Sequence, residues 1–297
     1  MAAERRGVDV YRFNTEEYPA SVRLSLDPAD PPSANLFVDD QRIELGQAKG
    51  IWIRRPQWPV ISAAVTDRYD RALAHQEALA AMGGAWRCLA NRCVSPPDVL
   101  QAARWKLPQI NLAARLGLPV PQTRVTQDAE EIRTFQAAGR TVMKAVGEAW
   151  VVLDGGERVG ETTELLSTDD VRGAIHTPVL VQRLVEKVAD WRVTMVGQRF
   201  FSVRMVAPDS APIDIRTTST ESIKHEVRSL PARLESRLLG FAHHYGLRYG
   251  AFDLAEDAGG TLWFLECNPA GQWAWLEPLT GLKITDALID LLLDPAR

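Results

Sequence analysis

The chain has 297 residues, a formal net charge of -4 and a hydrophobic content of 46%. This length exceeds the usual size of one domain, so we expect two packed subdomains with sizeable apolar cores. Acidic and basic residues are interspersed, and no basic stretch is long enough to predict a general nucleic-acid-binding surface.

Cysteine usage and hydropathy indicate the compartment. Cys88, Cys93 and Cys267 form an odd set without metal-type spacing, which favours structural thiols in a reducing environment. No stretch approaches the roughly 18 to 20 apolar residues that span a bilayer, and the N-terminal sequence lacks the apolar core of a secretory signal. We therefore predict a cytoplasmic protein that engages neither membranes nor nucleic acid.

The first 90 residues predict short strands followed by a helix. Strands are expected at 8–13, on both sides of a turn at Asp39-Asp40, and at 51–53. Residues 67–82 favour a helix that begins at Asp67 or Thr66 and ends at Gly83-Gly84.

From Ser95 onward the sequence predicts another helix and then a small α+β unit. The helix runs toward Leu116, and a kink or break should follow Lys106-Leu107 because Pro108 removes a backbone donor. In the unit that follows, a helix is expected at about 128–138, with strands at 123–125, 141–146, 150–153 and 179–185. The glycine-containing loop at 154–164 is a candidate mobile lid over a substrate.

The last third of the chain predicts two hairpins and two helices. Strands are expected at 191–196, 199–206, 251–255 and 261–267, and helices at about 231–245 and from about 284 onward.

The second of these hairpins carries polar residues where a buried strand would be apolar. Side chains alternate along a strand, so Glu266 and Asn268 share a face. A four-residue turn would pair Ala251 with Glu266 and place Asp253 on that face too. Two carboxylates and an amide oxygen then converge, and such ligands suit Mg²⁺ with nucleotide phosphates. An ordinary exposed hairpin whose acids face water is the alternative.

Basic residues in separate elements are the expected partners of this hairpin: Lys106, Lys144, Arg192 and Arg216. Lys144 is the only charge in the β-prone run TVMKAV, which places it at a sheet edge or in a polar site. The strand ending at Gln182–Glu186 could offer backbone groups to an adenine and a carboxylate to a ribose. Taken singly, each basic residue is explained better by a solvated face or a salt bridge.

Taken in order, these segments resemble the ATP-grasp superfamily over roughly residues 95–295. They are Lys106 in RWKLPQINLAARLGLPVPQT, Lys144 in VMKA, Gln182 to Val185, Asp190-Trp191-Arg192, Asp253, and Glu266-Cys267-Asn268-Pro269. Two further motifs, WIRRP at 52–56 and NPAGQWAWLE at 268–277, look more narrowly like the ATP-grasp ribosomal peptide maturases that make graspetides, as in microviridin biosynthesis.

The resemblance implies an α/β (α+β) protein with the ATP-grasp fold in three parts. An N-terminal pre-ATP-grasp domain would occupy 1–95, with a start that looks shortened relative to the family. A linker helix and the central lid subdomain would occupy 96–186. The C-terminal subdomain at 187–297 would carry the metal site, with nucleotide held between the last two parts.

The resemblance also implies an ATP- and Mg²⁺-dependent ligase. Such enzymes phosphorylate Asp or Glu side chains of a ribosomal precursor peptide and close them to ester or amide macrocycles, guided by a leader sequence, and a homodimer is expected. Carried over by motif, Lys106 and Lys144 would hold the phosphates, and Arg192 and Arg216 would face the transferred phosphoryl group. The adenine would be bound by Gln182, Leu184 and Val185, and the ribose by Glu186 or Asp190. The metals would be bound by Asp253, Glu266 and Asn268.

Arg54, Arg55 and Trp273 are weaker candidates for substrate contact. A salt bridge at a strand end explains the arginines about as well, and a buried domain seam suits Trp273 better than a peptide contact. Two other functions stay open: an ATP-grasp ligase joining a free amino acid or small molecule to a protein tail or small acid, and a regulator that binds nucleotide or peptide without catalysis. The full set of metal ligands and lysines argues against the regulator.

Overall fold

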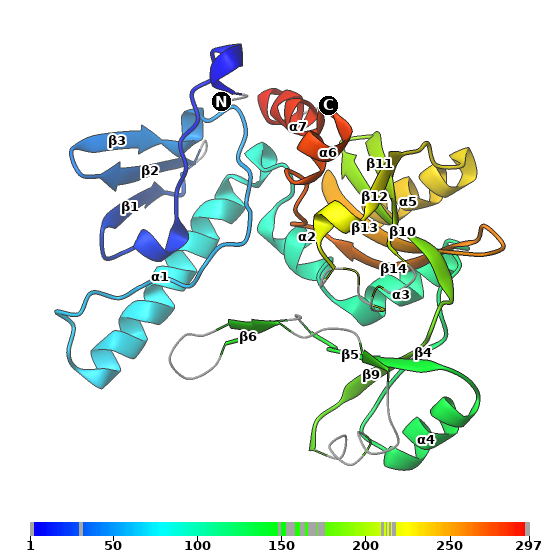
Figure 1. Cartoon of the computed structure of the whole chain (residues 1–297). Helices are drawn as coiled ribbons and strands as arrows, with labels where there is room; N and C mark the ends of the chain where they lie inside the picture. Colours follow the sequence, from blue (N-terminus) through cyan, green and yellow to red (C-terminus); the bar gives the residue numbers. More distant parts are fainter. Residues whose placement is uncertain are drawn as a thin grey trace.

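The computed structural model describes residues 3–29, 32–147, 150–152, 158–160, 164–165, 171, 176–208, 211, 213, 215 and 218–294. Within these ranges the strands form sheets of three, four, five and two strands. Figure 1 shows the three-stranded sheet and a long helix on one side of the molecule. The five-stranded sheet lies on the other side, and the four-stranded sheet lies below it.

The N-terminal part packs one helix against an antiparallel sheet. The strands are β1 (Val22–Asp27), β2 (Ser33–Val38) and β3 (Gln41–Glu44), paired in that order. The expected hairpin is confirmed, since β2 and β3 meet at Asp39, which has a φ of 51°. The expected strands at 8–13 and 51–53 are wrong. Phe13 instead packs its ring on Trp86, and Ile51 makes only an isolated bridge to Cys93.

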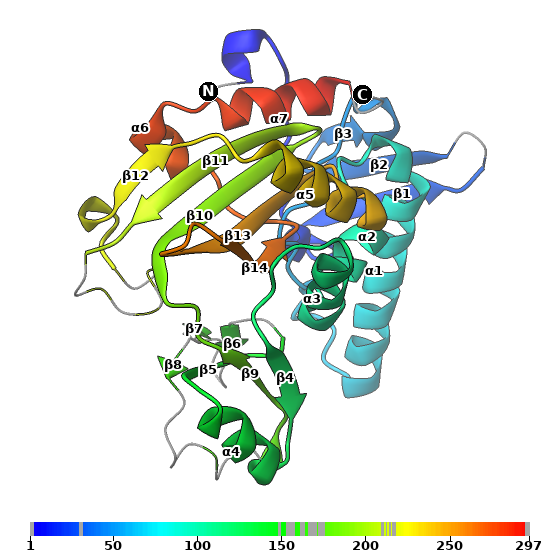
Figure 2. The ribbon, with the colours of Figure 1, turned by 90° about the vertical axis from the view of Figure 1, so that its right-hand side faces the viewer.

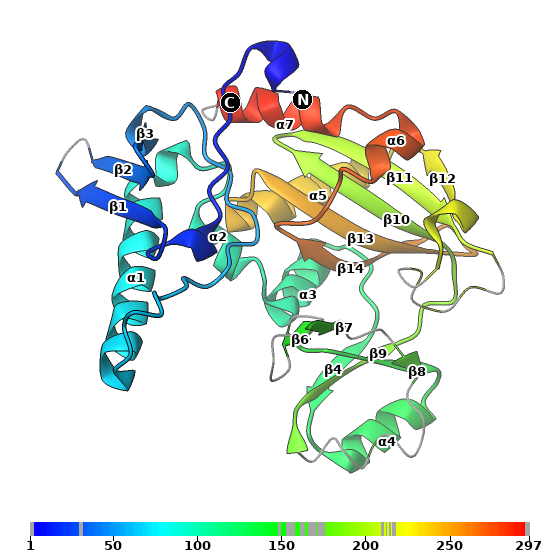
Figure 3. The ribbon, with the colours of Figure 1, turned by 60° about the vertical axis from the view of Figure 1, so that its left-hand side comes forward.

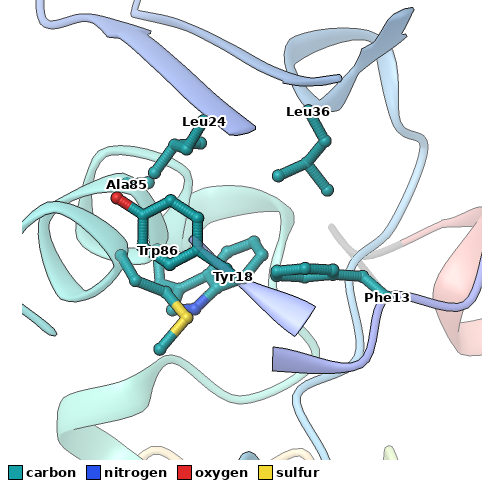
Figure 4. Close-up of a pocket in the computed structure, with 7 residues that line it drawn as sticks. Phe13, Tyr18, Leu24, Leu36, Ala85 and Trp86 are labelled. Carbon is teal, nitrogen blue, oxygen red and sulfur yellow. The ribbon is translucent and has the colours of Figure 1, made fainter. Parts of the chain in front are cut away.

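Helix α1 (Arg68–Cys88) is longer than expected. It begins after Asp67, whose carboxylate accepts a hydrogen bond from the Asp70 backbone N–H at 2.9 Å. The predicted end at Gly83-Gly84 is wrong, because Ala85 is buried against the sheet and the helix gains more from packing than two glycines cost, about 1 kcal/mol each. Figure 4 shows this packing, with Phe13, Tyr18, Leu24, Leu36, Ala85 and Trp86 gathered between sheet and helix.

The second predicted helix is two helices, α2 (Pro97–Ala102) and α3 (Lys106–Arg115). The predicted interruption exists as a break, but it falls at 103–105, ahead of Pro108, so its predicted position after Leu107 is wrong. Pro108 lies in the first turn of α3, where a missing backbone N–H breaks no helical hydrogen bond.

The central part is a four-stranded antiparallel sheet covered by one helix. Its strands are ordered β4 (Thr123–Thr126), β9 (Val179–Arg183), β5 (Thr141–Lys144) and β8 (Glu164–Leu165), with helix α4 at Ala129–Ala137. A separate hairpin joins β6 (Trp150–Val152) and β7 (Arg158–Gly160). Most of the predicted lid at 154–164 lies outside the described residues.

The C-terminal part is built on a five-stranded antiparallel sheet. Its order is β12 (Lys224–Val227), β11 (Arg199–Val206), β10 (Lys187–Val196), β13 (Tyr249–Asp257) and β14 (Leu262–Asn268). Helix α5 (Ala232–Tyr245) lies across one face, and α3 lies beside the edge strand β14 (Figure 2). Helices α6 (Leu276–Thr280) and α7 (Ile284–Leu293) pack against a second core cluster.

Side chains alternate between the two faces of the sheet along β10, and only one of these faces is covered by α5. Trp191, Val193 and Met195 are buried in the core that α5 covers. Arg192 therefore points to the opposite face. None of the described helices has the length and apolar character needed to cross a bilayer.

Candidate active site

The two acidic residues of the final hairpin lie directly opposite each other. Asp253 of β13 pairs with Glu266 of β14, and Ala251 pairs with Asn268. The expected pairing of Ala251 with Glu266 is wrong by two residues. Glu256 pairs with Leu262, already one residue out of the expected register, and the bulge after Asp253 absorbs one further residue of β14. The prediction that Asp253, Glu266 and Asn268 share a face holds in this register, with the carboxylates directly opposite rather than diagonal.

Arg192 continues this row onto the neighbouring strand, where it pairs with Asp253. Its Nη1 donates to both Asp253 carboxylate oxygens, at 2.7 and 3.0 Å, and its Nη2 donates to the Gln272 carbonyl at 3.0 Å. The Arg192 side chain is only 13% exposed. Burial lowers the pKa of Arg192, but the adjacent Asp253 carboxylate outweighs that effect and the pKa is raised. Arg192 is therefore a permanent cation beside the two carboxylates.

A tight turn after β14 completes this row. The Asn268 Oδ1 accepts a hydrogen bond from the Ala270 backbone N–H at 3.0 Å, and the Tyr249 hydroxyl donates to the Gly271 carbonyl at 2.7 Å. A Cβ at Gly271 would lie 2.5 Å from the Ala251 Cβ and 2.8 Å from the Arg192 Nη2. Only glycine lets the turn lie this close to β13 and Arg192.

This close approach makes Gly271→Ala destabilising. We expect the free energy of unfolding to fall by about 1–3 kcal/mol, because the new methyl group must displace β13 or the Arg192 guanidinium. Urea denaturation measures it. The control is Gly84→Ala in α1, where an added Cβ meets nothing within 4 Å and should stabilise by about 0.5–1 kcal/mol. Equal stability of the two variants would contradict the prediction.

Lys106 and Lys144 meet where the central sheet faces α3. The Lys106 Nζ donates to the carbonyl of Ala145, the residue after Lys144, at 2.8 Å. The Lys144 Nζ donates to the Gln182 Oε1 at 2.8 Å, and the Gln182 Nε2 donates to the Thr123 Oγ1 at 2.9 Å. Two ammonium groups from different elements are thus held at one end of β5.

The residues expected around adenine and ribose lie on β9, on β10 and on the connection between these two strands. Leu184 and Val185 fall between β9 and β10, and the Leu184 N–H donates to the Arg140 carbonyl at 2.9 Å. Glu186 is exposed and pairs with Arg140, whereas Asp190 pairs with Lys187 at 2.7 Å. Their roles toward a nucleotide stay predictions, and Arg216 lies outside the described residues.

The WIRRP motif reaches the same region from the N-terminal part. The Arg54 guanidinium lies 5.3 Å from the centre of the Trp273 ring and 5.8 Å from that of Trp52, and the two indoles are 4.7 Å apart. Trp273 is buried, as expected for a domain seam. Neither Arg54 nor Arg55 forms an ion pair with any residue that the structure describes, so the strand-end salt bridge receives no support.

Two residues of this region escaped the sequence analysis. Gln109 of α3 is 1% exposed and hydrogen-bonded to both backbone groups of Cys267. The sequence feature that could have revealed Gln109 is its spacing from Leu112 and Ala113, which places a polar residue on the buried face of the helix. Tyr249, which contacts Trp52 and Trp273, opens an apolar strand and carries no signal of its own.

Comparison with known proteins places this geometry in a fold. Residues 1–100 match the family model described as the MvdD pre-ATP grasp domain. A Chryseobacterium gregarium RiPP-associated ATP-grasp ligase in complex with ADP and a leader and core peptide has a TM-score of 0.88, with 24% identity over 100% of this chain and 92% of that chain. The chain has the ATP-grasp fold.

Two further ATP-grasp structures agree. Macrocyclase MdnB from Microcystis aeruginosa is 26% identical over 99% of this chain and 93% of that chain, with a TM-score of 0.79. The ATP-grasp ligase PsnB complexed with minimal precursor, Mg and ADP is 24% identical over 98% and 91%, with a TM-score of 0.75. No curated protein matches the sequence significantly. The resemblance to ATP-grasp peptide maturases inferred from the sequence is confirmed.

The donor set of this ATP-grasp chain fits Mg²⁺. Asp253 and Glu266 supply two carboxylates and Asn268 supplies an amide oxygen, all hard ligands. Within the described part of the chain no three His, Cys, Asp or Glu side chains are grouped so that they could hold a metal ion, and the third ligand proposed here is the amide of Asn268. The paired carboxylates would repel each other, and a divalent cation together with Arg192 would offset that repulsion.

Proposed function

We propose that this chain is an ATP-grasp ligase that activates Asp or Glu side chains of a ribosomal precursor peptide and closes them to ester or amide macrocycles. The observation that carries the proposal is the row of Arg192, Asp253 and Glu266 across three adjacent strands. A regulator that binds nucleotide or peptide without catalysis would not need it. Similar solved structures that hold precursor peptide, ADP and Mg support the same reaction class.

The reaction needs positioning and charge neutralisation more than covalent chemistry from the protein. When bound, ATP supplies the phosphoryl group and Mg²⁺ neutralises its oxygens. We assign the phosphates to Lys106 and Lys144, whose ammonium groups lie at the end of β5. Metal binding falls to Asp253, Glu266 and Asn268. We assign adenine binding to Gln182, Leu184 and Val185, and ribose binding to Glu186 or Asp190. Contact with the transferred phosphoryl group is assigned to Arg192 and Arg216.

The substrate carboxylate is best placed beside Arg54, Arg55 and Arg192. Burial lowers the pKa of Arg55, and the positive charges of Arg54 and Arg192 lower it further. Arg55 also has a φ of 47°, a backbone conformation that costs on the order of 1–3 kcal/mol in a residue other than glycine. In the described part of the chain Asp253 is the only ion-pair partner of these three arginines. An anionic ligand would relieve their mutual repulsion, and guanidinium groups match a carboxylate in shape.

The sheets support a proposed division of the chain into three parts. We propose a pre-ATP-grasp domain at 1–95, a linker and central subdomain at 96–186, and a C-terminal subdomain at 187–297. Each of these ranges contains one of the three larger sheets, which supports the division. Within the second range, α3 packs on β14 of the C-terminal sheet. A leader-bearing peptide partner, a cytoplasmic location and a homodimer are proposed from the family resemblance.

The test is a crosslinking reaction followed by mass. Purified protein with Mg-ATP and the precursor peptide encoded beside it should remove one water from the peptide for each bond formed. Omission of ATP and the variant Asp253→Ala should each leave the peptide mass unchanged. An unchanged peptide, with ATP consumed only when free amino acids are supplied, would replace the proposal by the small-substrate ligase.

A further inference from the structure

We propose that Gln109 is a positioning residue that sets the geometry with which Glu266 and Asn268 hold Mg²⁺. This inference rests on the proposed function. Gln109 touches neither ligand side chain in the structure and acts through the backbone between them.

The carboxamide of Gln109 is buried and fully hydrogen-bonded. Its Oε1 accepts from the Cys267 N–H at 2.7 Å, and its Nε2 donates to the Cys267 carbonyl at 2.8 Å and to the Ala103 carbonyl at 2.6 Å. A glutamine amide has two N–H donors, and both are used. The side chain is 1% exposed, so loss of these bonds would leave buried backbone groups unsatisfied.

These bonds hold both peptide groups that flank the candidate ligands. The Cys267 N–H belongs to the peptide that joins Glu266 to Cys267, and the Cys267 carbonyl belongs to the peptide that joins Cys267 to Asn268. One carboxamide therefore fixes the orientation of the two peptide planes that adjoin the Cα atoms of Glu266 and Asn268, from which the ligand side chains project. The strand β14 is the edge of the sheet, so Gln109 takes the place of a neighbouring strand at this point.

The same helix carries Lys106 one turn earlier. Figure 3 shows α3 beneath β14 at the edge of the sheet. Because Lys106 contacts Ala145 of the central sheet and Gln109 contacts Cys267, α3 links the two sides of the nucleotide site. A shift of α3 would change the separation between phosphate-binding lysine and metal ligands. Residues that orient metal ligands in this way typically contribute about 10–100-fold to metal affinity.

The variant Gln109→Met keeps the size of the side chain and removes all three hydrogen bonds. Calorimetric titration with ADP, in excess EDTA and at a series of Mg²⁺ concentrations, separates nucleotide affinity from metal affinity. We expect the Mg²⁺ concentration for half-maximal tightening to rise by about tenfold, with ADP affinity in EDTA within about twofold of wild type. Amide exchange at Cys267, which needs no metal, should also accelerate.

The control is Leu238→Ala in α5, a fully buried residue of the same core, which removes packing without removing a hydrogen bond to Cys267. It should lower the melting temperature without changing the Mg²⁺ dependence. If Gln109→Met resists folding, Gln109→Asn keeps both functional groups on a shorter arm and should give an intermediate effect. An unchanged Mg²⁺ dependence in the Gln109 variants overturns this inference. Wild-type protein whose ADP binding ignores Mg²⁺ overturns the proposed function itself.

Discussion

Replacing Glu266 by glutamine should abolish peptide crosslinking and leave the fold intact. We expect the rate to fall at least about 100-fold, because a carboxylate proposed to hold Mg²⁺ against the transferred phosphate becomes a neutral amide. Stability should be unchanged within about 0.5 kcal/mol. Glu266 is half-buried, and its side chain makes no hydrogen bond or ion pair with the residues that the structure describes.

Initial rates from peptide mass and the midpoint of urea denaturation check both halves of this expectation. Glu77→Gln, which removes the same charge from an exposed position on α1, serves as the control and should match wild type in both measurements. A Glu266→Gln enzyme that keeps more than half the wild-type rate would remove Glu266 from the metal site.

The sequence predicted the shared face of Asp253, Glu266 and Asn268 because two one-residue errors of register, one near the turn and one at the bulge, add to two residues. A net shift of one residue would have turned Glu266 and Asn268 to the other face. Asp253 and Glu266 share a face in any antiparallel pairing that shifts by whole pairs. The register itself could not be predicted, because the bulge after Asp253 leaves no mark in the residue types. The basic residues were found by their order along the chain, and only the fold brings Lys106 beside the strand that carries Lys144.

The elements that were predicted wrongly depend on tertiary packing, which the local sequence does not show. Gly83 and Gly84 are weak helix formers, yet α1 continues because Ala85 is buried on the sheet. The helix break at 103–105 accompanies the Gln109 bond to the Ala103 carbonyl, which local sequence does not reveal. Likewise, the gathering of Arg54 and Arg55 near Arg192 depends on the seam between the N-terminal and C-terminal parts.

Asp253→Asn should differ from Glu266→Gln by losing stability as well as activity. The rate should again fall at least about 100-fold. The free energy of unfolding should also fall by on the order of 2 kcal/mol, because the mostly buried Arg192 loses the charged acceptor of two hydrogen bonds. Urea denaturation and the peptide mass assay measure the two effects separately.

A double variant distinguishes the two roles of Asp253. In Asp253→Asn with Arg192→Met the unpaired cation is gone, so most of the lost stability should return, since replacing both members of a buried pair by well-packed neutral groups is often close to neutral. Activity should not return, because the double variant lacks both the carboxylate proposed for the metal and the Arg192 cation proposed for the phosphoryl group. If the single and double variants are equally unstable, the ion pair is not what Asp253 contributes to folding. If the double variant regains crosslinking, neither the metal role proposed for Asp253 nor the phosphoryl role proposed for Arg192 holds, and Asp253 serves only to neutralise Arg192.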